Sequence, residues 1–376
     1  MLTFLISAGL IAYVLAGYPA ALGLIARRRG RPVRRSTELP AISVVIPVHN
    51  GGRFLRRKLE SVLNADYPTE KLQVLIMLDG CTDTSEGIAR EYFDHNVRFI
   101  SLPRSGKPAA LNAAALQATG EIMVFTDVRQ DLHPDALRKL VGPFCEPGIG
   151  VVSGELILRT GATQAEADVG LYWRYETWIR RQLSLVDSMF GATGPFYAIR
   201  RQLFVPIPND ILLDDMYLPL SVFFKGYRLV VEPEAVAFDY PMTRQREFGR
   251  KVRTLGGNYQ LLLRMPRLLT PSNRLLWHFL SYKAGRLMLP WLLGALFCSS
   301  FRLPRPLNGI AVGAQVFVYS LALLDPLVAQ DSFFKKASSP VRTFVVLMAA
   351  TIMGIKVLFV PPQSLWKVTD IARTDS

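Results

Sequence analysis

The stretch AISVVIPVHN, residues 41–50, is a short run of apolar, mostly β-branched residues that ends in His49 and Asn50. Two runs of the same kind follow, QVLIML at 73–78 and EIMVFTD at 121–127. Helix-like stretches, RFLRRKLESVLNA and AALNAAALQA, lie between these runs. Alternation of strands and helices at this length predicts an α/β fold, in which helices cover both faces of a mostly parallel sheet.

Polar residues follow each of these strands, with Asp79 after the second and Asp127 after the third. Ligands of such sheets bind beyond the carboxyl ends of the strands. Two acids at the same sheet edge suit a ribose or base contact and a metal-bound diphosphate. Asp83 is better explained as a turn former or helix cap, because a helix-like segment follows it. The motifs GxGxxG and GxxxxGK[ST] do not occur, which disfavours a nicotinamide enzyme or a P-loop ATPase.

The chain has 376 residues, a net charge of +14 and 50% hydrophobic residues. This composition excludes a disordered tail, a fibre and a small disulfide scaffold. Most of the excess positive charge lies in RRRGRPVRR, residues 27–35, and in residues 244–267. Both blocks adjoin hydrophobic segments, which is typical of proteins that contact anionic lipid headgroups. A nucleic-acid partner is not expected, because such binders spread cations over a folded face.

Residues 1–26 carry no charged side chain and are long enough to span a membrane. Their arginines follow the apolar core, which favours an uncleaved anchor over a signal peptide. Three further spans are expected at 284–303, 306–326 and 341–360, and the first is weak because it contains Pro290. Lys283 and Arg286 are expected to snorkel to the inner surface. The predicted protein is therefore a multi-pass inner-membrane protein with a cytoplasmic middle segment.

The segment after the α/β domain has apolar residues at helical spacing and arginines elsewhere around the helix. This pattern favours a helix lying in the membrane surface over an ordinary amphipathic helix. Gly256 and Gly257 weaken that helix and predict a hinge. The expected organisation is a transmembrane anchor at 1–26, a basic linker at 27–40, a cytoplasmic catalytic domain at 41–243, interfacial helices at 244–283, a transmembrane bundle at 284–362 and a C-terminal tail at 363–376. The three cysteines are scattered and predict no disulfide in the cytoplasmic part.

Several motifs occur in order over residues 41–260: IPVHN, LDGCTDTS, SGKPAALNAA, TDVR, GATGPFYAIRR and LLDDMYLPLSVFFKGYRLVVEPEA. Together they resemble the membrane-bound glycosyltransferases of family 2, which include synthases of cellulose, hyaluronan and chitin oligosaccharides. The arrangement of spans is similar to the chitin-oligosaccharide branch in particular. The resemblance implies a glycosyltransferase type A (Rossmann-like) fold with a mixed sheet, inverting transfer from a UDP-sugar, and Mg²⁺ or Mn²⁺ as cofactor.

The resemblance also implies roles for single residues. Asp79 matches the acid that contacts uridine, and Lys107 matches the cation near the diphosphate. Asp127 matches the first acid of the metal-binding Asp-x-Asp motif, and Asp215 matches the general base. The expected nucleotide-sugar site comprises Pro47, His49, Asn50, Asp79, Lys107, Asp127 and Arg129, and the expected acceptor site comprises Trp173, Gly194, Asp214, Arg250 and Arg253.

Three positions depart from the family pattern. Arg129 stands in place of the second acid of Asp-x-Asp, so the motif supplies one metal-binding carboxylate rather than two. Whether the Arg129 guanidinium faces the diphosphate is left open by the sequence. Gly51 stands where a Glu often follows the first-strand Asn. The Gln-x-x-Arg-Trp signature of processive synthases appears as RKVRT, residues 250–254, which keeps the arginine and loses the tryptophan.

The chemistry of the expected site depends on Asp214 and Asp215. An acceptor hydroxyl is a poor nucleophile, so a carboxylate within hydrogen-bond reach must take its proton. Adjacent acids repel each other, which raises one pKa and keeps that carboxylate basic. Asp214 has a second interpretation as a helix cap.

Two features remain open between an acceptor role and a structural one. Trp173 lies among Tyr172, Tyr175 and Trp178, which are suited to stacking on sugar rings, to the headgroup level or equally to core packing. Gly194 would let an acceptor approach the backbone, although a turn glycine looks the same.

The leading hypothesis is a transferase that extends a poly- or oligosaccharide at the membrane, with a homo-oligomer as one route to secretion. The nearest alternative adds one sugar to a lipid carrier or a lipid-linked acceptor. A hypothesis of another class is an inactive membrane adaptor that binds a UDP-sugar.

Overall fold

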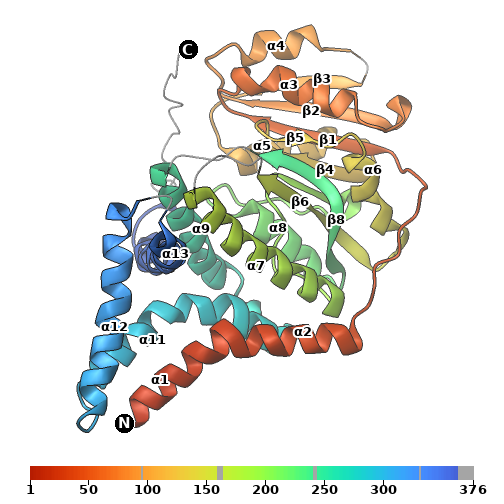
Figure 1. The fold of residues 1–376 in the computed structure, drawn as a ribbon. Coiled ribbons are helices and arrows are strands. Elements are labelled where there is room, and N and C mark those ends of the chain that lie inside the picture. Colours follow the sequence, from red (N-terminus) through yellow and green to blue (C-terminus); the bar gives the residue numbers. More distant parts are fainter. Residues whose placement is uncertain (95, 159–163, 240–243, 330–331, 363–376) are drawn as a thin grey trace.

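A single mixed sheet forms the centre of the structure, a computed structural model that describes residues 1–376 except 95, 159–163, 240–243, 330–331 and 363–376. The predicted C-terminal tail lies outside the described residues. The strand order is β3-β2-β1-β4-β7-β6-β8-β5 (Figure 1). The strands are β1 Ile42–Val48, β2 Leu72–Asp79, β3 Val97–Leu102, β4 Ile122–Thr126, β5 Asp131–Leu132, β6 Ile149–Leu158, β7 Phe196–Arg200 and β8 Arg228–Asp239.

The expected mixed α/β sheet is confirmed, and the three strands expected from the sequence are β1, β2 and β4. β1 pairs in parallel with β2 and β4, whereas β7 is antiparallel to β4 and β6. Both faces of β1 are buried: Val45 lies in one hydrophobic cluster and Val44 in the other. This double burial explains why the strand reads as continuously apolar.

Helices cover the sheet on both sides (Figure 1). Buried side chains of α3, α4 and α6 join one core cluster, and those of α5, α7 and α8 join the other. The second cluster continues without a break into the C-terminal helices through Phe279 and Val357. These helices are α3 Gly52–Leu63, α4 Ser85–Glu91, α5 Lys107–Gln117, α6 Ala136–Val141, α7 Gln164–Val186 and α8 Asp214–Phe223.

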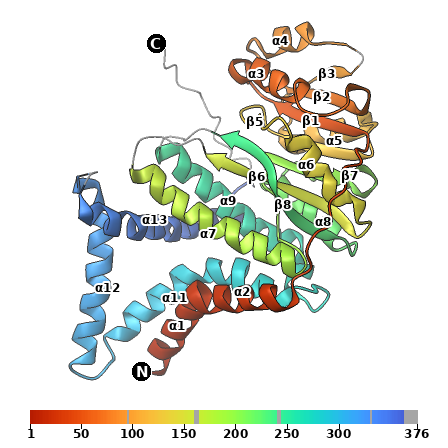
Figure 2. The ribbon, with the colours of Figure 1, turned by 45° about the vertical axis from the view of Figure 1, so that its right-hand side comes forward.

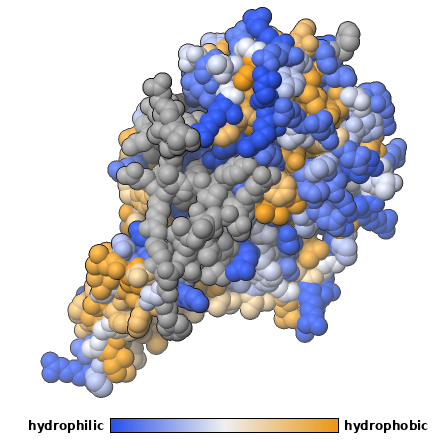
Figure 3. All heavy atoms as spheres, turned by 45° about the horizontal axis from the view of Figure 1, so that its top comes forward, coloured by the Kyte–Doolittle hydropathy of each residue, from blue (hydrophilic) through white to orange (hydrophobic). Residues whose placement is uncertain are grey.

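Three helical stretches of the described residues are long and apolar enough to cross a membrane. The first is Leu2–Arg29, which contains α1 Leu2–Ala12, the π-turn η1 Tyr13–Gly17 and α2 Tyr18–Arg29. The second is Leu307–Leu327, which contains α12 Leu307–Leu324 and the 3-10 turn η7 Asp325–Leu327. The third is Phe334–Leu358, which contains most of α13 Phe333–Gly354 and the 3-10 turn η8 Ile355–Leu358. α12 stands away from the catalytic domain (Figure 2), and apolar surface gathers at the lower left of Figure 3.

The expected span at 284–303 is not among these stretches, so two C-terminal candidates replace the predicted three. The helix in this region, α11 Gly285–Ser300, carries Arg286 near its start, and the charge-free part after this arginine is only about 21 Å long, which is less than the roughly 30 Å of a bilayer core. It continues α10 Leu276–Phe279 and η6 Leu280–Ala284 and packs on α1. Arg286 pairs with Glu176 of α7 instead of snorkelling.

The basic segment after the sheet forms α9 Arg244–Arg264, as the apolar spacing predicts. The helix continues through Gly256 and Gly257 without a break, and the hinge stays a prediction. A Cβ on Gly257 would lie 2.4 Å from Leu213 Cγ, and a Cβ on Gly354 of α13 would lie 2.8 Å from the Gly256 nitrogen. The glycines therefore let α9 pack closely against α13 on one side and the catalytic domain on the other.

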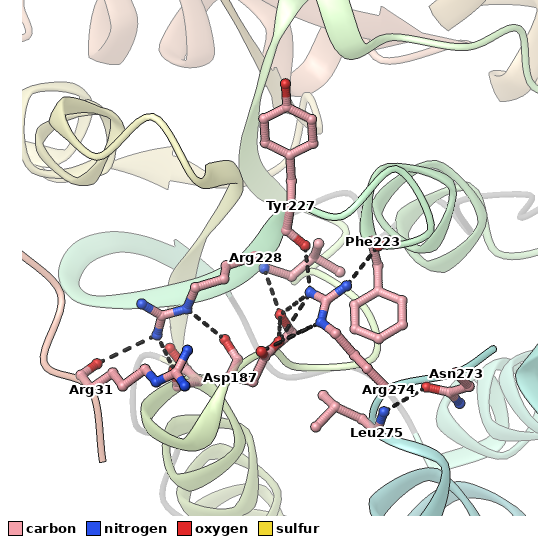
Figure 4. A network of polar contacts seen from close by, with 11 residues as sticks. Arg31, Asp187, Phe223, Tyr227, Arg228, Asn273, Arg274 and Leu275 are labelled. Atoms are coloured by element: carbon pink, nitrogen blue, oxygen red, sulfur yellow. Dashed lines mark hydrogen bonds and ion pairs between the residues drawn. The ribbon is translucent and has the colours of Figure 1, made fainter. Parts of the chain in front are cut away.

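Arg274 joins the segment before α10 to the catalytic domain (Figure 4). Its guanidinium donates to the carbonyls of Phe223 at 2.8 Å and Tyr227 at 2.7 Å. It also forms an ion pair with Asp187 at 3.0 Å and stacks 3.8 Å from the centroid of the Phe223 ring. Arg228 donates to the Asp187 carbonyl at 3.0 Å, so the end of α7, the start of β8 and this segment are held together.

Replacement of Arg274 tests whether its guanidinium holds the segment before α10 to the catalytic domain. We expect Arg274→Ala to lower the free energy of unfolding by about 2 kcal/mol or more, because it leaves two backbone carbonyls and Asp187 without their charged donor. Arg305→Ala, at an exposed arginine, is the control and should change stability by about 0.5 kcal/mol at most. Unfolding of the detergent-solubilised proteins measures both. Equal stability of the two variants would contradict the coupling.

Candidate active site

Lys107, the first residue of α5, lies between acids from two distant segments. Its Nζ is 2.9 Å from Asp127 Oδ1, just after β4, and 3.4 Å from Asp214 Oδ2, at the start of α8. Asp215 follows in the same turn of α8, and the charges of Asp127 and Lys107 both act on it. The structure therefore brings together the predicted base, the predicted metal ligand and the predicted diphosphate cation.

A loop between α7 and β7 holds Asp215 in place. The Ala192 nitrogen donates to the Asp215 carbonyl at 2.8 Å. A Cβ on Gly194 would lie 2.5 Å from Asp215 Oδ2, so only glycine leaves room for this carboxylate. The close approach that we expect from an acceptor at Gly194 is thus made by the Asp215 carboxylate. The same loop reaches the other acid, because the Asp127 nitrogen donates to the Pro195 carbonyl at 3.3 Å.

Burial and the adjacent Asp214 carboxylate raise the pKa of Asp215 to about 6, although Lys107 and Arg253 act in the opposite direction. Burial disfavours the charge on Lys107, but the surrounding carboxylates outweigh it and raise the pKa of the ammonium above its ordinary value. Asp215 is therefore a carboxylate that is ionised at neutral pH and still able to accept a proton.

Two buried oxygens in this cluster have no hydrogen-bond partner among the described residues: Tyr197 Oη and Asp214 Oδ2. Tyr197 belongs to β7, and burial, together with the neighbouring carboxylates, raises the pKa of its phenol well above the usual value. Buried polar atoms are normally satisfied. Tyr197 Oη is thus available to a bound ligand or to water, whereas Asp214 Oδ2 faces Lys107 Nζ at 3.4 Å.

The ends of β1 and β2 form the second part of the site. His49 Nδ1 lies 2.7 Å from the Asp79 carbonyl, and burial lowers the pKa of the imidazole, as does nearby Arg104. Asn50 adopts a positive φ of 48° and accepts from the Thr82 nitrogen at 2.8 Å. Pro47 lies two residues earlier in β1. Because β1 lies between β2 and β4, the end of β2 is about 10 Å from the end of β4, after which Asp127 follows.

Asp79 is buried, and its carboxylate already has partners. It accepts from the backbone nitrogens of Ser105 at 2.6 Å and Gly106 at 3.1 Å, and Arg104 forms an ion pair with it. Asp79 thus orders the loop that leads into Lys107. Its expected contact with uridine stays a prediction.

Two of the three departures from the family pattern, Arg129 and Gly51, have structural explanations. Arg129 donates to Asp239 at the end of β8, with Nη2 2.5 Å from Oδ2, so its guanidinium is held by a carboxylate. A Cβ on Gly51 would lie 2.9 Å from Val48 Cγ1, which leaves no room for a Glu side chain.

The predicted acceptor residues separate into two groups. Arg253 is close enough to Asp215 to act on its pKa, and Asp214 faces Lys107. Trp173 donates from Nε1 to the Leu156 carbonyl at 3.1 Å and packs α7 on β6, which favours the core-packing interpretation. Arg250 is exposed on α9. The side chain of Tyr172 lies outside the described residues.

Sequence reasoning missed Arg180 and Lys58, whose side chains hold the segments that carry the acids around Lys107. Arg180 of α7 donates to Thr193 Oγ1 at 2.7 Å and Ser153 Oγ at 2.8 Å, which fixes the loop that carries Gly194. Lys58 of α3 is fully buried and donates to Thr126 Oγ1 at 2.6 Å, and burial lowers its pKa to about 7. An arginine or lysine on an otherwise amphipathic helix gives no sequence signal of such a role.

The described residues contain no group of three or more His, Cys, Asp or Glu side chains that could hold a metal ion. A complete protein cage is not needed, because Mg²⁺ is usually held by one or two carboxylates together with substrate phosphates and water. Asp127 is one such carboxylate, and its side chain is about a third exposed at the sheet edge. The donor set therefore fits a divalent ion shared with a bound diphosphate.

The fold is a mixed α/β fold of the glycosyltransferase type A-like kind. Residues 43–206 match the family model described as glycosyl transferase family 2. The structure of the mannosyltransferase PcManGT from Pyrobaculum calidifontis, solved with GDP-Man and Mn²⁺, has a similar fold. Its TM-score is 0.70 at 22% identity, over 95% of this chain and 99% of that one.

Sequence relatives agree with this family. Glycosyltransferase AglE of Haloferax volcanii is 29% identical over 211 residues, which are 54% of this chain and 67% of the relative. An N-acetylglucosaminyltransferase of Rhizobium meliloti is 27% identical over 275 residues, which are 67% of this chain and 63% of the relative. The chain thus spans about two thirds of the length of these relatives.

Gly194 gives a direct test of the geometry around Asp215. We expect Gly194→Ala to lower kcat about 100-fold, because the added methyl group must displace the carboxylate. The KM for the donor should change little. Gly148→Ala, where a Cβ meets nothing within 4 Å, is the matched control. Steady-state kinetics measures both, and a fully active Gly194→Ala would contradict the proposed base.

The pH dependence tests the electrostatics. We expect kcat/KM of the wild type to fall below about pH 6 as Asp215 is protonated. Lys107→Met removes a cation that lowers the pKa of Asp215, so the acid limb should move to higher pH on a much reduced rate. Lys225→Met, at an exposed lysine, should leave the profile unchanged. An acid limb that stays in place in Lys107→Met would contradict the assignment.

Proposed function

We propose that the protein is an inverting glycosyltransferase that moves a hexose from a UDP-sugar to an acceptor hydroxyl at a membrane. The observation that carries this proposal is the position of Asp215, a buried carboxylate of raised pKa beside Lys107 and Asp127. An inactive adaptor that only binds a nucleotide sugar would not need a base held against a glycine. UDP is favoured over other nucleotides by the family resemblance.

In the proposed reaction, Asp215 takes the proton of the acceptor hydroxyl as its oxygen attacks the anomeric carbon. The sugar bond to the nucleotide diphosphate breaks on the opposite face, so no covalent sugar intermediate is needed. Lys107, with Arg253, lies where it would stabilise the negative charge of the leaving diphosphate. A Mg²⁺ or Mn²⁺ ion held by Asp127 would neutralise part of the same charge.

We further propose that the chain is a multi-pass protein of the inner membrane with its catalytic domain in the cytoplasm. The exposed arginines at the end of α2 and the three candidate spans support this placement. Anionic lipids would then contact the basic blocks, and a homo-oligomer is compatible with the largely uncovered α12.

The acceptor defines two candidate activities. A growing poly- or oligosaccharide is favoured by the resemblance to membrane-bound synthases. A lipid-linked acceptor is favoured by the candidate membrane spans on both sides of the catalytic domain in the chain. Both use the same base and the same donor site.

The donor and the base are tested together. Purified protein is incubated with a panel of UDP-sugars and GDP-mannose in Mg²⁺ or Mn²⁺, and nucleotide release and products are measured by mass spectrometry. We expect release of UDP from one UDP-hexose, formation of a β-linked product from an α-linked donor, and loss of activity by at least about 100-fold in Asp215→Asn.

Asp66→Asn, at an exposed acid, is the control and should keep full activity. Donor binding should persist in Asp215→Asn, because Asp215 acts on the acceptor. Use of GDP-mannose alone would refute the UDP-sugar donor, and full turnover by Asp215→Asn would refute the base.

A further inference from the structure

Tyr197 of β7 is fully buried, yet its hydroxyl has no hydrogen-bond partner among the residues that the structure describes. The centroid of its ring lies 4.8 Å from that of Phe125, its register partner on β4, in the core cluster on the α5 and α8 side of the sheet. Ser153, its register partner on β6, shows the usual situation, because its hydroxyl accepts from the Thr193 nitrogen at 2.8 Å. Since buried hydroxyls are normally hydrogen-bonded, we expect a partner for this phenol that is not a protein group.

The surroundings of this phenol are anionic. The charges of Asp214, Asp215 and Asp127 all act on Tyr197, and that of Asp214 acts most strongly. Burial and these charges raise the pKa of the Tyr197 phenol well above its usual value, so the hydroxyl keeps its proton. The phenol is therefore a neutral hydrogen-bond donor placed beside carboxylates that can only accept.

Asp214 is a buried carboxylate that needs such a donor. Its Oδ2 lies 3.4 Å from Lys107 Nζ, whereas Asp127 receives the shorter contact of 2.9 Å from the same ammonium. Within the described part of the chain, Asp214 Oδ2 makes no hydrogen bond. In the proposed reaction Lys107 also serves the leaving diphosphate, so Asp214 then shares this cation with a further anion. A second donor would compensate the buried charge of Asp214.

We propose that Tyr197 is a positioning residue of the transfer reaction: its hydroxyl donates to an ordered water molecule, and this water donates to the Asp214 carboxylate. One buried water can satisfy both groups, since such waters make about two to four hydrogen bonds. Asp214 then stays ionised and in place while Lys107 serves the diphosphate, and the start of α8 keeps Asp215 against Gly194. This inference rests on the proposed transferase function and adds a residue to its site.

The proposed hydrogen bond has a direction in pH. Asp214 and Asp215 are adjacent acids that titrate as a pair, and a donor to either of them favours the ionised form. Lys107 of α5 and Arg253 of α9 act on Asp215 in the same direction, whereas Asp127 after β4 opposes them. Loss of the phenol donor should therefore make the pair easier to protonate and move the acid limb of the rate to higher pH.

The first arm of the test is Tyr197→Phe, which removes the hydroxyl and keeps the ring on Phe125. UDP release from the UDP-hexose that the donor panel identifies is measured against pH. We expect kcat at neutral pH to fall about fivefold to tenfold, its acid limb to lie about 0.5–1 pH unit higher, and the donor KM to stay within about twofold. The limb of kcat should move more than that of kcat/KM, because Lys107 is shared with the diphosphate only in the complex. Tyr227→Phe, at a half-buried tyrosine, is the matched control and should behave like the wild type.

The second arm tests the route through Asp214 with a double-mutant cycle. Asp214→Asn removes the charge that the water serves, so on this background Tyr197→Phe should change kcat and the acid limb little. On the background of Asp66→Asn, an exposed acid, the effect of Tyr197→Phe should be complete. Fully additive effects of Asp214→Asn and Tyr197→Phe would overturn the proposed contact with Asp214.

Thermal unfolding separates a positioned hydroxyl from one that has no partner. A phenol without any partner would make Tyr197→Phe at least as stable as the wild type, because the variant no longer buries an unpaired polar group. Such stability together with an unmoved acid limb overturns this inference while the transferase stands. Absence of UDP release by the wild type with every donor overturns the proposed function itself.

Discussion

The ion pairs of Lys107 are the constraint on which the site depends. A single ammonium holds Asp127 at the end of the parallel half of the sheet and Asp214 at the start of α8. Without this cation, three carboxylates would face one another in a buried space and repel. The pairing keeps all three segments together, and the charge of Lys107 also limits the rise in the pKa of Asp215 that burial and Asp214 cause, so the carboxylate stays ionised at neutral pH.

Much of the catalytic half could be predicted from the sequence. β1, β2 and β4 are recognisable because both of their faces are buried, which makes them continuously apolar. The acids after them must then meet at one edge. The order of motifs across 41–260 added Lys107 and Asp215, which local patterns alone could not connect, since Lys107 and Asp214 are far apart in the chain.

The remaining features depend on tertiary packing. Tyr197 reads as an ordinary strand residue, and Arg180 as the polar side of a helix, until the loop at Gly194 is placed between them. Trp173 looked suitable for a sugar, but its indole nitrogen is used to fasten α7 to β6. The expected span at 284–303 is not among the candidate spans, because the helix ends at Ser300 and its charge-free part after Arg286 is short, an end that hydropathy does not reveal.

The glycine contacts of α9 have a consequence for experimental work. Gly354 rests on the backbone of Gly256, and Gly257 on the opposite side touches Leu213, directly before the two acids. A truncation that removes the last helix, the usual route to a water-soluble version of such an enzyme, would take away one wall of this stack. Deletion mapping should therefore treat residues 333–358 as part of the catalytic unit rather than as a detachable anchor.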